Sequence, residues 1–237
     1  MTILERGLRK IGVINDPSYN KYLKRSFSQS GEDIIMKYIF DALGIHKPSF
    51  IDIGAHHPHY LNNTFLFYLN GSRGINIEPD FKLFEQFPIF RKDDINLNFG
   101  IGVKTEVLDF YLISAPALNT FSKEEAERIV NETNNKIKEI KKIQIKTIKD
   151  VVETYCNNIF PDILSIDVEG MDELIIKSIS FEKNTPKVIC IESIAFSENG
   201  RGEKQTNLIE YIKSKGYLLY ADTNINTLFV LKEIWER

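Results

Sequence analysis

The chain has 237 residues, of which 43% are hydrophobic, enough for one large domain with a sizeable core. Its formal net charge of -3 gives no bulk attraction to polyanions, which excludes nucleic acid as an obligate partner. There is no uncharged apolar run of about 18 residues and no leader pattern, so we expect neither a membrane span nor export. Only two cysteines occur, and Cys190 lies in an apolar run, so a reducing cytoplasmic location is expected.

Residues 1–26 are interpreted as an N-terminal extension and residues 27–237 as the domain. An amphipathic pattern between Ile3 and Ile14 fits packing on the domain, subunit pairing or contact with a membrane surface. A helix is predicted over residues 31–43, because serines precede it and two acidic residues lie in its first turn.

Strand and helix patterns alternate after this helix. The predicted strands are 49–53, 74–77, 95–101, 106–113, 143–145, 163–168, 187–191, 217–221 and 227–231. The predicted helices between them are 62–70, 80–87, 148–157, 172–179 and 206–215. Such alternation implies parallel strands joined by right-handed crossovers, and the last two strands predict an antiparallel hairpin at the sheet edge.

The segment from Ser122 to Lys142 is highly charged, yet mostly apolar residues recur in it at helical spacing. These residues are Ala126, Ile129, Thr133, Ile137 and Ile140. The spacing predicts an amphipathic helix within an insertion at about residues 114–142. The insertion either caps the site or packs between subunits, so a homodimer is one alternative.

The first strand of the alternating part carries Asp52 and stops at Gly54, which lets the backbone turn sharply beneath a ligand. The next residues, Ala55 to Pro58, supply none of the further glycines that a dinucleotide's pyrophosphate requires. Pro58 has no amide hydrogen, and two histidines crowd the approach. The loop therefore favours a nucleoside ligand without phosphates, such as S-adenosylmethionine.

A second strand ends at Glu78, one helix further along the chain, as expected for a neighbouring parallel strand. A carboxylate there can accept hydrogen bonds from both hydroxyls of a ribose. The alternative is that Glu78 caps the helix after the Glu78-Pro79-Asp80 turn. We favour ribose binding.

Asp167 and Glu169 are two residues apart at the end of another apolar strand, so in extended geometry both carboxylates leave the same face. They are candidates for a general base, a site for the substrate hydroxyl, or a contact to the cofactor's sulfonium or amino group. With a third oxygen ligand they would bind a divalent cation. The structural alternatives are a helix-cap contact for Glu169 and a buried hydrogen-bond hub for Asp167.

Three histidines, His56, His57 and His59, follow Gly54 where the transferred group would lie. An imidazole is suited to take a proton near neutral pH, so one of them is a candidate base, with plain loop structure as the alternative. Zinc is disfavoured, because no cysteine lies close and the spacing matches no familiar zinc pattern, so no metal is assigned. Asn63 is interpreted as a helix cap or a substrate contact.

Together these segments resemble the FkbM family of S-adenosylmethionine-dependent methyltransferases. The matching segments are Phe27–Asp33, Asp52–Pro58, Asn63-Thr64, Tyr68, Gly71, Gly74–Pro79 and Ile166–Gly170. The resemblance implies an α/β, Rossmann-like class I methyltransferase fold, with a mostly parallel seven-stranded sheet and an antiparallel last strand. It also implies S-adenosylmethionine as cofactor and methyl transfer to a hydroxyl oxygen.

The resemblance implies roles for individual residues. The expected cofactor contacts are Asp52, Gly54 and Ala55 on the methionine side, Glu78 and Pro79 at the ribose, and Asp94 and Gly100 near the adenine. From their own positions, and not from the resemblance, the expected catalytic residues are Asp167, His56 and His57, and the expected substrate contacts are His59, Asn63 and Glu169. Segment 114–145, which would shape the acceptor pocket, matches weakly, so the acceptor is expected only as a small molecule or saccharide.

Two other functional classes stay open. A nicotinamide-dependent oxidoreductase on the same sheet would bind dinucleotides, against which the crowded loop before Pro58 argues. A non-catalytic binding protein with a Rossmann-like fold would tolerate the loss of Asp167. Titration with S-adenosylhomocysteine and with NAD distinguishes the oxidoreductase, and a methyl-transfer assay distinguishes the binding protein.

Overall fold

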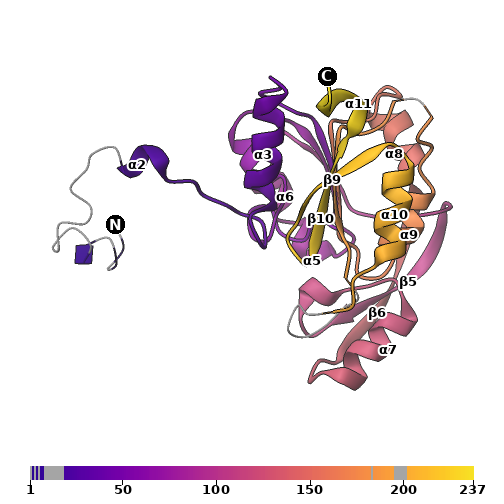
Figure 1. Ribbon diagram of the computed structural model, residues 1–237. Helices are drawn as coiled ribbons and strands as arrows, with labels where there is room; N and C mark the ends of the chain where they lie inside the picture. Colours follow the sequence, from indigo (N-terminus) through magenta and orange to yellow (C-terminus); the bar gives the residue numbers. More distant parts are fainter. Residues whose placement is uncertain (1, 3, 5, 8–18, 183, 195–201) are drawn as a thin grey trace.

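The computed structural model describes residues 2, 4, 6–7, 19–182, 184–194 and 202–237. The amphipathic segment predicted between Ile3 and Ile14 therefore lies almost wholly outside the described residues. A short helix, α2 (Tyr19–Tyr22), stands apart from the body of the domain (Figure 1). Across the described ranges, every helix is too short or too polar to cross a membrane.

A seven-stranded sheet forms the centre of the domain, in the order β3-β2-β1-β7-β8-β10-β9. Its strands are β1 (Phe50–Ile53), β2 (Gly74–Ile77), β3 (Ile95–Leu97), β7 (Ile163–Ile166), β8 (Val188–Glu192), β9 (Tyr217–Asp222) and β10 (Asn226–Leu231). Strand β10 is antiparallel to both neighbours, and the pairs from β3 to β8 are parallel. The predicted fold class is therefore confirmed, and the predicted hairpin places β9 at the edge.

Helices cover both faces of this sheet (Figure 1). Helices α3 (Glu32–Ala42) and α6 (Phe87–Phe90) lie on one face, and α8 (Ile148–Tyr155), α9 (Asp172–Lys177) and α10 (Thr206–Ser214) on the other. Short helices α4 (Phe65–Leu69), α5 (Phe81–Phe84) and α11 (Lys232–Trp235) also occur. Strands β1, β7 and β8 are buried along their whole length, as parallel strands covered on both faces must be.

A second sheet of three strands contains part of the predicted insertion. The long strand β6 (Ile137–Thr147) pairs parallel with β4 (Gly100–Gly102) and antiparallel with β5 (Glu106–Ile113). The helix predicted over residues 122–142 is therefore right only for α7 (Lys123–Glu132), and its second half is wrong. The strand predicted over residues 95–101 is likewise two strands, β3 and β4, in different sheets.

Helix α7 ends where the local chemistry favours a turn. The Thr133 hydroxyl donates to the carbonyl of Ile129 at 2.8 Å and accepts from the amide of Asn135 at 2.9 Å. Beyond this turn, β5 offers a long partner, paired from Ile113 opposite Ile137 to Glu106 opposite Ile145. Strand pairing therefore overrides the helical spacing of the isoleucines in this segment.

The carboxyl ends of β1, β2, β7 and β8 lie at one edge of the central sheet. Asp52 is in register with Asn76 of β2 and Ser165 of β7, so the loops that follow these strands converge. A short 3-10 helix, η1 (Pro116–Leu118), contributes residues to the space over this edge. Ligands of open α/β sheets bind at such places.

Candidate functional site

A cavity of about 610 Å³ lies at this edge of the sheet. Its walls come from the loops after β1, β7 and β8 and from the segment around η1. A smaller cavity of about 40 Å³ is lined by Glu78 and Pro79, among others. Gly54, His56 and the pair Asp167 and Glu169 line both cavities, so the strand-end signals of the sequence meet in one place.

Gly54 forms the floor where the two cavities meet. Its φ of 74° is a conformation that favours glycine. The amide of Asp167 donates to the carbonyl of Ile53 at 3.0 Å, which holds the loop after β7 against the turn. A Cβ atom built on Gly54 would lie 1.8 Å from the carbonyl oxygen of Asp167. Glycine is therefore required here because the backbone after β7 packs directly against the turn.

Asp52 lies beneath the loop and is 3% exposed. Its carboxylate accepts hydrogen bonds from the Thr64 hydroxyl at 2.8 Å and from the Asn62 amide at 3.2 Å. Burial raises the pKa of Asp52, against these hydrogen bonds, which favour the charged form. Asp52 also lines the large cavity, so it presents a fixed carboxylate to the ligand.

A buried arginine that sequence reasoning missed holds this loop. Arg91 is fully buried and donates to the carbonyl of Pro58 at 3.1 Å, to Asn62 Oδ1 at 3.2 Å and to Thr64 Oγ1 at 3.1 Å. Its Nε lies 2.8 Å from the Asp94 carboxylate, and both side chains of this ion pair are inaccessible. The guanidinium therefore fixes the loop that carries the histidines.

Glu78 is buried between two backbone amides. Its carboxylate accepts from the amide of His56 at 2.8 Å and from the amide of Asp80 at 2.7 Å. Burial raises the pKa of Glu78 to about 8, although both hydrogen bonds favour the charged form. The bond to Asp80 is the helix-side contact that the structural alternative predicted. Glu78 also lines the small cavity.

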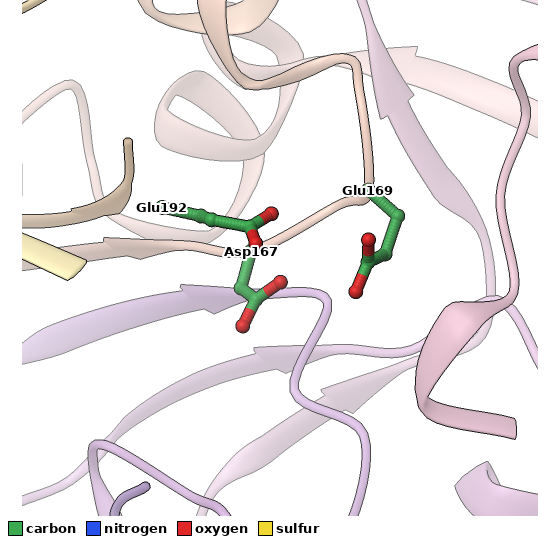
Figure 2. Close-up of side chains that lie close together, drawn as sticks. All are labelled: Asp167, Glu169 and Glu192. Atoms are coloured by element: carbon green, nitrogen blue, oxygen red, sulfur yellow. The ribbon is translucent and has the colours of Figure 1, made fainter. Parts of the chain in front are cut away.

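Three carboxylates that line the large cavity approach one another (Figure 2). Asp167 and Glu169 follow β7, and Glu192 ends β8. Burial and the negative charge of Asp172 raise the pKa of Asp167 to about 7. Burial and neighbouring carboxylates raise the pKa values of Glu169 and Glu192 well above their usual range. The wall is thus unusually rich in closely spaced acids.

The structure separates the three histidines. His56 lines both cavities, and burial, with the charge of His57, lowers its pKa. His57 and His59 pack edge to face with ring centroids 4.5 Å apart, and neither is among the residues that line the two cavities. Asn63 lines the large cavity and donates to the Ser165 hydroxyl at 3.2 Å. As catalytic or substrate residues, all four stay predictions.

Ala55, Asp94 and Gly100 occupy different surroundings. Ala55 is buried and lines the large cavity. Asp94 is enclosed by the ion pair to Arg91 and accepts from the amide of Gly74 at 3.0 Å. Gly100 lies in β4, where an added Cβ atom would meet Phe121 at 2.5 Å. Asp94 and Gly100 line neither of these cavities, so their predicted contacts to adenine have no support in the geometry.

Glu192 is a site residue that the sequence analysis did not find. It directly follows the apolar run from Val188 to Ile191, as Glu78 follows Ile77, so the same strand-end rule identifies it. Arg91 carried no comparable signal, because it stands in a charged segment of surface appearance, Arg91-Lys92-Asp93-Asp94. Its burial depends on contacts with the loop after β1.

Comparison with known families gives one match. The model of the methyltransferase FkbM domain matches residues 52–219, which contain Asp52, Glu78, Asp167 and Glu192. A search of curated proteins found no match.

Solved structures with similar folds include three methyltransferases. A TehB-like S-adenosylmethionine-dependent methyltransferase from Corynebacterium glutamicum is 12% identical with a TM-score of 0.42, over 97% of this chain and 96% of that one. A precorrin-6y C5,15-methyltransferase from Geobacter metallireducens is 11% identical with a TM-score of 0.44, over 91% of this chain and 96% of that one. A 1,6-didemethyltoxoflavin-N1-methyltransferase from Burkholderia thailandensis is 9% identical with a TM-score of 0.37, over 97% of this chain and 89% of that one. Likenesses of this degree say nothing about the acceptor.

Proposed function

Because the chain belongs to the methyltransferase FkbM family, we propose that it transfers a methyl group from its cofactor, S-adenosylmethionine, to a hydroxyl oxygen of a small-molecule acceptor. Methyl transfer and the cofactor follow from the family, whereas the oxygen as acceptor atom is our proposal. The observation that carries it is the large cavity, whose wall adds the polar side chains of Gln29, Asn63 and Asn135 to its carboxylates. Such a wall suits a molecule with several hydroxyl groups, such as a saccharide.

The residues at the sheet edge fit this cofactor. The cofactor supplies a methyl group on a positively charged sulfur. Gly54 lines both cavities without adding a side chain to them, and the fixed carboxylate of Asp52 suits the methionine side. Glu78 borders the adjoining small cavity, where it can accept hydrogen bonds from ribose hydroxyls. The segment that includes Ala117 and Phe121 also lines this small cavity, so it must move aside for an adenosine to enter.

The protein's part in the reaction is alignment and proton removal. Holding the acceptor oxygen in line with the methyl group accounts for much of the rate that such a site can supply. The oxygen gains the methyl group and loses its proton to a base. Two groups on the cavity wall are our candidates, Asp167 and His56. The lowered pKa of His56 leaves its imidazole neutral near pH 7 and able to accept the proton.

The cofactor assignment predicts one specific binding pattern. S-adenosylhomocysteine should bind at one site per chain and raise the melting temperature, whereas NAD should do neither. Calorimetry and thermal denaturation measure both ligands under the same conditions. Transfer of labelled methyl to a hydroxylated acceptor, tested over a panel of sugars and phenols, then tests oxygen as the target. An absence of S-adenosylhomocysteine binding would refute the proposed function, and transfer only to nitrogen acceptors would refute its oxygen specificity.

Glu78 predicts that cofactor affinity depends on pH. Its pKa of about 8 leaves it mostly protonated at pH 7, whereas ribose hydroxyls donate best to the ionised form. Binding must therefore release a proton below pH 8, and affinity for S-adenosylhomocysteine should rise about tenfold between pH 7 and pH 9. In Glu78→Gln, affinity should be lower and flat over this range. Calorimetry across the pH series measures both proteins.

The matched control is Glu85→Gln, an exposed carboxylate at the end of α5, which should keep the pH dependence of the unchanged protein. The stability of the protein without ligand gives a second readout, because the contribution of Glu78 to it should fall as pH rises, whereas cofactor affinity should increase. Since the folded pKa of Glu78 is raised, its contribution to stability is full below the unfolded value near 4.5 and is lost as pH rises through 8. An identical pH profile in Glu78→Gln would show that another group is responsible.

A further inference from the structure

The three carboxylates on the cavity wall converge from two strand ends. Figure 2 shows Asp167 and Glu169 on the loop after β7 and Glu192 on β8, with their carboxylates directed toward a common space. One carboxylate oxygen from each residue lies within 4.8 Å of the others. Three ionised carboxylates at this spacing would repel one another strongly, which is one cause of the raised pKa values of Glu169 and Glu192.

Glu192 is the member that is hardest to explain without a ligand. It is only 9% exposed, and its carboxylate has no hydrogen bond or ion pair within the described part of the chain. Nearby polar groups are engaged elsewhere, since the Asn226 amide donates to Glu32 at 3.2 Å and Ser193 bonds to Thr227 at 2.6 Å. A buried acid without a partner either keeps its proton, as the raised pKa of Glu192 indicates for the chain alone, or meets a positive charge, so Glu192 is placed to receive a cation.

Other buried acids of this chain show what a satisfied carboxylate looks like. Asp172 accepts from the amides of Val168 and Gly170, and Glu32 accepts from Thr223, Asn226 and the amide of Ser30. The nearby Arg128, whose charge favours the ionised form of Glu169, is itself held by Glu125 at 2.6 Å. The protein thus supplies partners to its structural acids, and the three on the cavity wall differ from them.

We propose that Asp167, Glu169 and Glu192 bind a divalent cation that prefers oxygen ligands. All three ligands are carboxylates, which suit Ca²⁺, Mg²⁺ or Mn²⁺ and not zinc. Oxygens on opposite sides of a Ca²⁺ ion stand about 4.6 to 5.2 Å apart, so the present spacing already suits Ca²⁺. Oxygens on opposite sides of a Mg²⁺ ion stand at most about 4.2 Å apart. A small rotation of the glutamate side chains would bring the three oxygens to that separation. Glu192 is the third oxygen ligand that the sequence alone left unnamed.

The cation would face the large cavity. Such ions take six or more oxygens, so coordination positions beyond the three carboxylates stay open to an acceptor oxygen. A coordinated hydroxyl has a lowered pKa, and Asp167 would act as a ligand, which leaves His56 as the proton acceptor. This catalytic use depends on the proposed function, whereas cation binding does not.

Direct binding of the metal tests the proposal. Mn²⁺ titration followed by electron paramagnetic resonance should show one saturable site per chain, from which Ca²⁺ or Mg²⁺ competes. Glu192→Gln should weaken Mn²⁺ binding at least tenfold, because it removes one of three anionic ligands. Ca²⁺ should also raise the melting temperature of the unchanged protein. The melting temperature of Glu192→Gln should respond little to Ca²⁺.

The control is Glu173→Gln, the same chemical change on α9 at a carboxylate already paired with Lys177, and it should leave Mn²⁺ binding unchanged. If Glu192→Gln does not fold, Glu169→Gln carries the same prediction. The proposal is overturned if the unchanged protein has no saturable Mn²⁺ site, or if the glutamine variants bind Mn²⁺ as tightly as it does. Binding of S-adenosylhomocysteine measured without metal is independent, so a protein that binds Mn²⁺ but not S-adenosylhomocysteine refutes only the proposed function.

Discussion

Gly54→Ala is expected to lower the free energy of unfolding by about 2 to 5 kcal/mol and to abolish cofactor binding. Two effects add at this position. A non-glycine residue at a φ of 74° is strained, and the new methyl would lie 1.8 Å from the carbonyl oxygen of Asp167. That oxygen is backbone, so relief requires the end of β7 to move away from β1. Chemical denaturation and calorimetry with S-adenosylhomocysteine measure the two losses.

The chain contains a matched control for this substitution. Gly44 has a φ of 71°, and a Cβ atom added there would meet nothing within 4 Å. Gly44→Ala therefore carries the conformational strain without the clash and should cost about 1 to 2 kcal/mol, with unchanged cofactor binding. If the two alanine variants were equally stable and bound cofactor equally, the close contact between Gly54 and the backbone of Asp167 would contribute neither to stability nor to cofactor binding.

Arg91→Met is expected to lower the free energy of unfolding by about 3 to 5 kcal/mol. The substitution keeps much of the side-chain volume but leaves the Asp94 carboxylate buried without its cation. It also removes the donors to Asn62 and Thr64, the residues that hydrogen-bond Asp52. Cofactor affinity should therefore fall together with stability, as denaturation and calorimetry on the same samples can establish.

Two further variants separate this effect from a general loss of charge. Arg73 also pairs with an aspartate, Asp93, but both side chains are nearly half exposed, so Arg73→Met should cost less than about 1 kcal/mol. In the double variant Arg91→Met with Asp94→Asn, part of the stability should return, because the buried charge of Asp94 is removed together with its partner. A double variant less stable than Arg91→Met would contradict the account given for this ion pair.

The sheet could be predicted because its signals are local. Each central strand is a short apolar run between turn residues, and burial on both faces makes such runs continuous. The segment around Ile137 was predicted wrongly for the opposite reason, since its periodicity fits a helix and only pairing with β5 makes it a strand. Long-range pairing of this kind leaves little trace in the residues themselves.

The site was predictable to the extent that it follows strand ends. Asp52, Glu78 and Asp167 lie where the parallel order of the sheet requires, and the structure places them around adjoining cavities. The contacts of Arg91 could not be predicted, because they join segments that lie far apart in the sequence. Arg91 and Asp94 are close in sequence, so their ion pair is local. The contacts of Arg91 with the loop after β1 depend on how α6 packs beside that loop and α4. Asp94 therefore resembled a ligand contact while serving as a partner for a buried cation.

The position of β10 determines when the site is completed during synthesis. β10 pairs with β8 so that Asn226 is opposite Glu192, and it is made after every other strand of the sheet. While the ribosome is still translating residues before Asn226, β8 has an open side and the backbone around Glu192 lacks its neighbour. The residues of the Gly54 turn and the Arg91 ion pair are thus made well before β10, and the strand that pairs beside the third cavity carboxylate is made last of the sheet.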